Sequence, residues 1–206
     1  METELLTVTP LGGGQEVGRS CILLEFKRRV LLLDCGVHPG REGEDALPFI
    51  DSHDPSTVEL ILITHFHLDH CAALPYYTEK TTFKGRIFMT HATKAVMKLL
   101  LTDNVRLQSQ PLYTEQELQA CIDKIEVVDF HQTIEVKGIR FTGSAAGHVL
   151  GAAMFTIEID NVKILYTGDY SMEKDRHLSE AEKPPGRPPD LLIVESTFGN
   201  LTLEPR

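Results

Sequence analysis

Residues 60–70 read LILITHFHLDH, and this segment carries most of what the sequence predicts. The part over 60–64 is a continuous apolar run that stops at His65, which suits a buried strand. Imidazole nitrogens and carboxylate oxygens are ligands that suit zinc. The sequence therefore predicts a metal site at the C-terminal end of this strand, with four potential ligands in six residues: His65, His67, Asp69 and His70.

The spacing within this cluster separates the ligands into two pairs. His65 and His67 are two residues apart in extended backbone, so their side chains point to one side. Asp69 and His70 lie beyond a turn and can serve a second ion. The alternative is a loop of solvated histidines without a metal, but such residues seldom cluster so densely for that reason alone.

Two later segments offer further ligands. His148 lies in the small-residue turn AAGHVLG over 145–151, whose glycines permit close backbone approach. Asp169 follows directly after an expected strand over 162–166, where its carboxylate can bridge two ions. Either residue alone is more often structural, and the cluster at 65–70 makes both of them candidate ligands.

Strand and helix patterns surround these motifs and predict a mixed α/β layered domain. We expect a hairpin of strands over 20–26 and 29–34, turning at Lys27 and Arg28. A helix over 91–105 is expected after the N-cap Thr90, with the apolar stripe Ala92, Ala95, Val96, Leu99 and Leu100 packed in the core. A second helix follows the capping box Thr114-x-x-Glu117. The remaining strands are expected over 5–10, 60–64, 86–89, 125–129, 133–136, 139–143, 152–159, 162–166 and 191–195.

Composition excludes several classes of protein. The 206 residues are 42% hydrophobic and 24% charged, which is ordinary for a globular chain and excludes wholesale disorder. No apolar run approaches the roughly 20 residues of a membrane span, and the acidic start is unlike a signal peptide. The four cysteines form no C-x-x-C pair and are expected as reduced thiols of an intracellular protein. The formal charge of −10 argues against unassisted binding of nucleic acid.

The order His65-x-His67-x-Asp69-His70 resembles the signature of the metallo-β-lactamase superfamily. His148 and Asp169 match the later ligand motifs of that superfamily, and Asp34 matches the early aspartate that supports its metal loops. The resemblance implies that His65, His67 and His148 hold one Zn2+ and that Asp69 and His70 hold a second. Asp169 would bridge the two ions. The residues expected to take part in catalysis are Asp69, Asp169, Asp34 and Glu195.

Further segments resemble the β-CASP nucleases of that superfamily, namely those over 10–20, 34–36, 66–74, 147–154, 166–169 and 195–197. Three more segments resemble the endonuclease subunits of cleavage and polyadenylation complexes, namely those over 38–40, 45–48 and 88–95. The resemblance implies a nuclear, zinc-dependent endonuclease that cleaves messenger-RNA precursors by two-metal hydrolysis of a phosphodiester. The implied partners are RNA and other subunits of such a complex, including a related pseudo-nuclease, with no membrane. Glu195 matches a β-CASP position where an acidic residue orients a later histidine; a carboxylate capping a nearby loop is the alternative.

The same resemblance implies a metallo-β-lactamase fold, an αββα layered sandwich, of which residues 1–206 form an N-terminal part. A β-CASP insertion would begin near residue 196, and a return segment would then complete the domain. That segment supplies two histidines, one closing the second zinc site and one acting as general acid, and this sequence contains neither. The fragment alone is therefore expected to be incomplete for catalysis.

Three other functions stay open on the sequence. An Integrator-type RNA endonuclease shares most of the motifs but fits the intervening segments less well. Another hydrolase of the same fold, acting on a thioester, a lactam or tRNA ends, shares the metal signature. A scaffold subunit without activity would be expected to have lost ligands, whereas all six ligand positions of this chain are intact.

Overall fold

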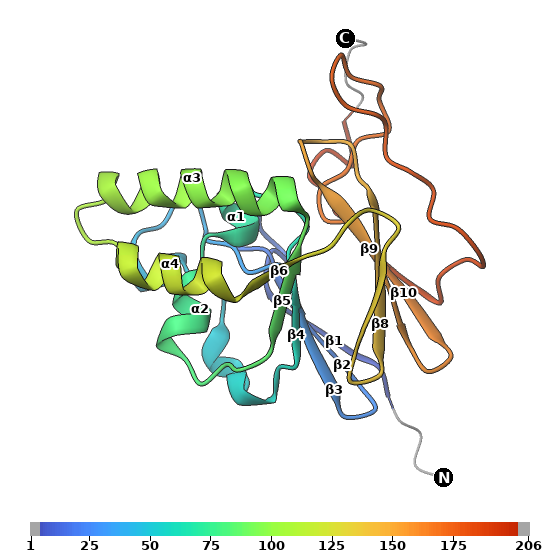
Figure 1. The fold of residues 1–206 in the computed structure, drawn as a ribbon, viewed down its shortest axis with the longest axis horizontal. Helices are drawn as coiled ribbons and strands as arrows, with labels where there is room; N and C mark the ends of the chain where they lie inside the picture. Colours follow the sequence, from blue (N-terminus) through green and yellow to red (C-terminus); the bar gives the residue numbers. More distant parts are fainter. Residues whose placement is uncertain (1–4, 202–206) are drawn as a thin grey trace.

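The computed structural model describes residues 5–201, which form two β-sheets stacked face to face (Figure 1). The first sheet has the order β1-β2-β3-β4-β5-β6 and the second the order β11-β10-β9-β8-β7. The strands of the first sheet are β1 (Thr7–Gly12), β2 (Cys21–Phe26), β3 (Arg29–Leu33), β4 (Leu60–Leu62), β5 (Arg86–Met89) and β6 (Ile125–Val127). Those of the second are β7 (Thr133–Val136), β8 (Ile139–Ala145), β9 (Ala153–Ile159), β10 (Val162–Tyr166) and β11 (Leu191–Ile193).

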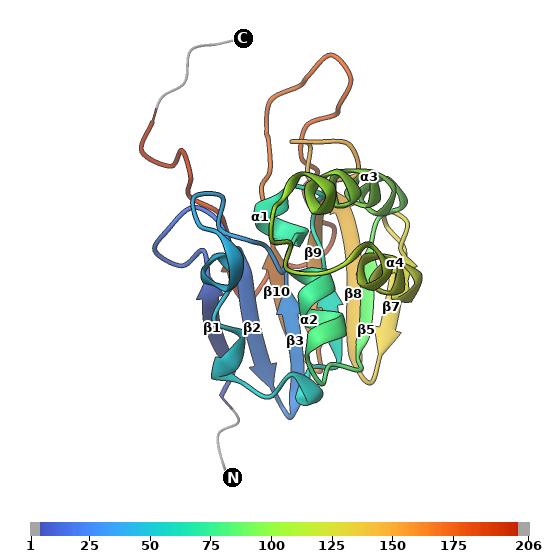
Figure 2. The same cartoon turned by 90° about the vertical axis from the view of Figure 1, so that its left-hand side faces the viewer.

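The α-helices cover the outer face of the first sheet (Figures 1 and 2). They are α1 (Leu68–Cys71), α2 (Leu74–Lys80), α3 (His91–Leu107) and α4 (Glu115–Lys124). Three short 3-10 helices lie between β3 and β4, at Gly43–Ala46, Ile50–Ser52 and Pro55–Thr57. Between residues 5 and 201 no α-helix follows β7, so this part of the chain forms the α, β and β layers of the expected sandwich.

Strand β4 has an unbroken apolar sequence because both of its faces are buried. Ile61 packs toward the helices, in a core that includes Met97 and Cys121. Leu60 and Leu62 pack toward the second sheet, in a core that includes Phe88, Phe141 and Phe155. All three β4 residues have 0% exposure, so the strand that precedes the metal motif is held rigidly between two cores.

The expected strands are confirmed, with shifts of one or two residues at several ends. The β2–β3 hairpin turns at Lys27 and Arg28, whose φ angles of 50° and 63° are those of a tight type I′ turn. The helices α1 and α2 were not expected, because with 4 and 7 residues they are too short for a helical apolar repeat to be recognised.

The caps of the two long helices are confirmed. Thr90 accepts a hydrogen bond from the backbone of Thr93, and Thr114 and Glu117 form the capping box of α4. The predicted core stripe of α3 is wrong. The buried residues are Thr93, Met97 and Leu101, whereas Leu99 is 71% exposed, Leu100 is 39% exposed and Ala95 is also exposed.

A hydrogen bond explains why the stripe was misplaced. Thr93 counts as polar in a hydropathy pattern, but its hydroxyl donates to the carbonyl of Gly151 and is therefore satisfied inside the protein. The buried face of α3 thus lies about one position along the helix from the predicted one. Within residues 5–201, none of the helices is long and apolar enough to cross a membrane.

Candidate metal centre

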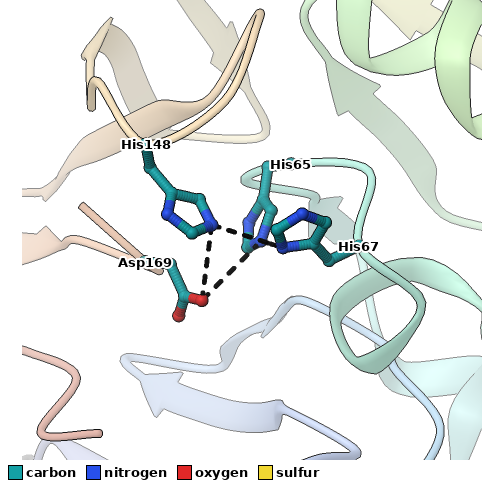
Figure 3. Close-up of side chains that lie close together, drawn as sticks. All are labelled: His65, His67, His148 and Asp169. Carbon is teal, nitrogen blue, oxygen red and sulfur yellow. Dashed lines mark hydrogen bonds and ion pairs between the residues drawn. The ribbon is translucent and has the colours of Figure 1, made fainter. Parts of the chain in front are cut away.

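Four of the predicted ligands converge at one end of the two sheets (Figure 3). His65 and His67 follow β4, His148 lies in the turn between β8 and β9, and Asp169 follows β10. One nitrogen or oxygen from each of the four lies within 4.8 Å of all the others. Because β4 and β10 belong to different sheets, this cluster forms only where the sheets meet.

The distances within this group are short. His67 Nδ1 lies 3.0 Å from His65 Nε2 and 3.3 Å from His148 Nε2. Asp169 Oδ2 lies 3.6 Å from His148 Nε2 and 3.9 Å from His65 Nε2. Three imidazole nitrogens and a carboxylate oxygen therefore face a common point, which is the donor set of a transition-metal site.

A second group adjoins the first through Asp169. The other oxygen of this carboxylate, Oδ1, lies 3.4 Å from Nε2 of His70. The same His70 nitrogen lies 3.6 Å from Oδ2 of Asp69. His70 is nearly fully buried, whereas the two aspartates are about one-quarter exposed, so this group opens toward solvent on its carboxylate side.

The buried carboxylate of Asp34 fixes residues of both groups through hydrogen bonds. It accepts hydrogen bonds from the backbone nitrogen of Thr64 (2.7 Å), the hydroxyl of Thr64 (2.9 Å) and Nδ1 of His70 (2.8 Å). The hydroxyl of Tyr166 donates a fourth, at 2.7 Å. Asp34 has 0% exposure, and its carboxylate is occupied by bonds from Thr64, His70 and Tyr166. It therefore positions His70 and the start of the motif and does not face the metal site itself.

These hydrogen bonds leave the correct nitrogens free for a metal. The Thr64 hydroxyl has one proton and gives it to the Asp34 carboxylate, which can only accept. Thr64 Oγ1 therefore accepts from Nδ1–H of His65, 3.0 Å away, and the lone pair of His65 lies on Nε2. The His70 Nδ1–H is likewise directed at Asp34. Both Nε2 atoms thus face the site, and the residues fit a bound cation.

Charge is distributed unevenly over the metal-free site. Burial lowers the pKa of His65 to about 2, an effect that the neighbouring His70 reinforces. Burial also opposes charge on His70, but the carboxylates of Asp34 and Asp169 outweigh it and raise the pKa of His70 to about 10. Burial tends to raise the pKa of Asp169, and the His70 imidazolium outweighs it and lowers that pKa to about 2. The first group is therefore rich in neutral imidazole, the form that binds metal.

The absence of a side chain at Gly36 allows the backbone of Asp69 and His70 to approach the loop after β3 closely. A Cβ on Gly36 would lie 1.7 Å from the carbonyl oxygen of Asp69 and 2.5 Å from the nitrogen of His70. The backbone of the Asp69 segment therefore lies directly on the loop after β3. Two backbone hydrogen bonds join the same surfaces, from Ser20 N to Asp69 O (2.8 Å) and from Cys35 N to His70 O (2.8 Å).

Glu195 forms none of the hydrogen bonds or ion pairs described for these two groups. It follows β11, and its Oε2 accepts a hydrogen bond of 2.8 Å from the backbone of Thr197. That contact is the loop-capping alternative considered for this residue. Burial lowers the pKa of His148, and the charges of Asp169 and, more weakly, Glu195 oppose this effect.

The sequence reasoning missed Thr64 and Tyr166 as members of the site. Each directly precedes a motif, Thr64 before His65 and Tyr166 before Thr167-Gly168-Asp169, and that adjacency is the one signal that points to them. Neither hydroxyl could be assigned a partner before β3, β4 and β10 had been placed together.

Comparison with known proteins agrees with this geometry. The metallo-beta-lactamase superfamily domain matches residues 23–196. The chain belongs to the metallo-β-lactamase superfamily. It is 55% identical over 209 residues to cleavage and polyadenylation specificity factor 73 of Drosophila melanogaster, covering 100% of this chain and 30% of that protein. It is 58% identical over 198 residues to cleavage and polyadenylation specificity factor subunit 3-I of Arabidopsis thaliana, covering 94% and 28%.

A third relative of this metallo-β-lactamase chain is endoribonuclease YSH1 of Yarrowia lipolytica, 54% identical over 210 residues and covering 100% of this chain and 25% of that protein. The chain thus spans 25–30% of the length of these relatives.

Two solved structures share the fold at low sequence identity. A protein of unknown function from Enterococcus faecalis aligns with a TM-score of 0.57 and 18% identity, over 81% of this chain and 44% of that chain. The metallo-beta-lactamase fold protein YhfI from Bacillus subtilis aligns with a TM-score of 0.54 and 16% identity, over 82% and 65%.

Proposed function

We propose that this chain is the metal-binding part of a zinc-dependent endoribonuclease that cleaves messenger-RNA precursors during 3′-end processing. The observation that carries the proposal is the convergence of all six predicted ligands into two adjoining groups that share Asp169. The names of the relatives, cleavage and polyadenylation specificity factor and endoribonuclease, supply the substrate class and the process.

Each residue has a defined task in this proposal. His65, His67 and His148 hold one Zn2+, Asp69 and His70 hold a second, and Asp169 joins the two positions. When bound, the two ions supply Lewis acidity and charge neutralisation at the phosphodiester. Asp34 keeps His70 and, through Thr64, His65 in the tautomers that present Nε2. The carboxylates of Asp69 and Asp169 compensate the positive charge of the ions.

Partners and location follow from the same proposal. The chain carries a net charge of −10, so we expect RNA to be delivered by other subunits of a cleavage and polyadenylation complex, a related pseudo-nuclease among them, and by further parts of the protein. The protein would act in the nucleus. Residues 1–206 would be an N-terminal part of the metallo-β-lactamase domain, with a β-CASP insertion beginning near their end and Glu195 orienting a residue beyond it.

The decisive experiment replaces Asp69 and His70 together with alanine in the complete protein within its complex. We expect cleavage of a polyadenylation-site RNA to be lost and the zinc content, measured by plasma mass spectrometry, to fall from two ions to one. The matched control is Asp123→Ala with Lys124→Ala, a similarly charged pair at the end of α4. Undiminished cleavage by the Asp69/His70 variant would refute the roles assigned to these residues.

Two further results would redirect the proposal. Turnover of a small ester or thioester, with none on RNA, would indicate a different hydrolase of the metallo-β-lactamase superfamily. Tight RNA binding by the complete protein alone, falling steeply with salt, would refute delivery by partner subunits.

A further inference from the structure

The turn that carries His148 has an unusual backbone. His148 itself has a φ of 56°, a left-handed conformation that few residues other than glycine adopt. Such a conformation persists only where the surrounding structure holds it. The contacts that hold this turn therefore determine whether His148 reaches the first metal group.

Two buried threonines at the start of α3 hold one side of the turn. Thr90 and Thr93 are 5% and 0% exposed. The Thr90 hydroxyl donates to the carbonyl oxygen of Gly151 at 2.7 Å, and the Thr93 hydroxyl donates to the same oxygen at 3.1 Å. A Cβ on Gly151 would lie 2.7 Å from the Cβ of Ala92 and 2.8 Å from Thr90 Oγ1. The turn is therefore seated directly on the first turn of the helix.

The opposite side of the turn is held by backbone hydrogen bonds and by one side-chain contact, from the N–H of Ala145 to Oε2 of Glu182 at 3.2 Å. Ser171, two residues after Asp169, donates its N–H to the carbonyl oxygen of Ala146 at 2.9 Å. The turn thus lies between the start of α3 and the segment that follows Asp169. Of these two supports, the threonine side is made by side chains at the end of the turn that follows His148, and it can be removed by substitution.

We infer that Thr90 and Thr93 are positioning residues for His148, acting through Gly151, and that the N-terminal turn of α3 is part of the support of the metal centre. This inference rests on the proposed role of His148 as a zinc ligand. The hydroxyls do not bind the ion, and they act by fixing the carbonyl that lies three residues after His148. Substitution of residues that orient metal ligands typically costs about 10–100-fold in metal affinity.

Thr93 is the better target for a test, because the helix cap uses Thr90 Oγ1 and the backbone of Thr93 and survives the loss of the Thr93 hydroxyl. That hydroxyl also lies 3.0 Å from Thr90 Oγ1, so its removal tests the threonine pair as one support. Two pairs of variants in the complete protein isolate that hydroxyl. Thr93→Val is compared with the wild type, and Thr93→Ala is compared with Thr93→Ser, which lacks the same methyl group but keeps the hydroxyl. The second pair gives the answer if valine prevents folding.

Zinc affinity is measured by competition with a chromophoric chelator, and the visible absorption of bound Co2+ reports the coordination geometry. We expect Thr93→Val and Thr93→Ala to bind zinc about tenfold more weakly than their partners, with an altered Co2+ spectrum. In a His148→Ala background the Thr93 substitutions should change neither quantity, because the side chain that they position is gone.

Equal affinity and equal spectra within both pairs would overturn the inference and leave the proposed metal site standing. An undiminished Thr93 effect in the His148→Ala background would also overturn it, because the hydroxyl would then act through another part of the structure. If His148→Ala itself bound two zinc ions as tightly as the wild type, His148 would not be a zinc ligand, and this inference would be refuted as well.

Discussion

Replacing Tyr166 with phenylalanine removes a single hydroxyl from the network around Asp34. That hydroxyl donates to Asp34 Oδ2 at 2.7 Å, and the two residues are 5% and 0% exposed. A hydrogen bond to a charged group contributes about 1.5–3 kcal/mol to stability. Phenylalanine fills the same space, and Asp34 keeps its bonds from Thr64 and His70. We therefore expect Tyr166→Phe to lower the free energy of local unfolding, in the segments around Asp34 and Tyr166, by about 1.5–3 kcal/mol.

Two other tyrosines provide matched controls. The Tyr113 hydroxyl is buried and donates to the carbonyl oxygen of Ala72 at 3.0 Å, an uncharged acceptor, so Tyr113→Phe should cost only about 0.5–1.5 kcal/mol. The Tyr76 hydroxyl makes an exposed hydrogen bond of 3.4 Å to Glu44, so Tyr76→Phe should stay within about 0.5 kcal/mol of the wild type.

Hydrogen exchange followed by mass spectrometry measures these free energies in the complete protein after metal removal, in the segments that each hydroxyl joins. The order Tyr166, Tyr113, Tyr76 is expected for the losses. A Tyr113→Phe variant that loses as much as Tyr166→Phe, or more, would refute the claim that the charge of Asp34 strengthens the buried bond.

Four more predictions follow from the same structure. Gly36→Ala should displace the Asp69 backbone and remove one bound zinc, whereas Gly143→Ala, with 3.6 Å to its nearest neighbour, should keep both; equal zinc contents would contradict this. Because the pKa of His70 is raised above its ordinary value, its ion pair with Asp34 should stabilise the metal-free protein fully below about pH 6.5, and this stability should be lost as the pH rises toward 10, as urea unfolding at several pH values would show. Zinc binding at pH 7.5 should release about one proton from His70, which calorimetry in buffers of different ionisation enthalpy measures, and no release would mean that His70 is not a ligand. A thiol reagent should leave the native protein unlabelled at its four free and buried cysteines, Cys21, Cys35, Cys71 and Cys121, and fast labelling would contradict their burial.

The metal cluster could be predicted because its signal is local. His65, His67, Asp69 and His70 lie within six residues, and the apolar run before them fixes a strand whose end presents them. The hairpin and the helix caps were likewise predicted from neighbouring residues. Local patterns of this kind depend only on the backbone geometry of neighbouring residues. They can therefore be predicted without knowledge of the tertiary fold.

The support of the site could not be predicted in this way, because its partners are distant in the sequence. Asp34 meets Thr64 because β3 and β4 pair in parallel with Leu33 opposite Leu62, which places the residues after both strands side by side. Thr93 meets Gly151 across 58 positions. The second contact also misled the hydropathy analysis of α3, since it buries a residue that the pattern treats as exposed.

The position of the site between the two sheets links metal binding to the assembly of the fold. His65, His67, Asp69 and His70 come from the first sheet and its helices, whereas His148 and Asp169 come from the second. The hydrogen bond from Tyr166 to Asp34 crosses the same boundary without a metal. Bound zinc would join the sheets at that point, so its binding free energy would add to the stability of the sandwich. Removal of zinc should therefore loosen first the loops at the end of the sheets that carries the site, while β4 stays protected between its two cores, one of which joins the sheets.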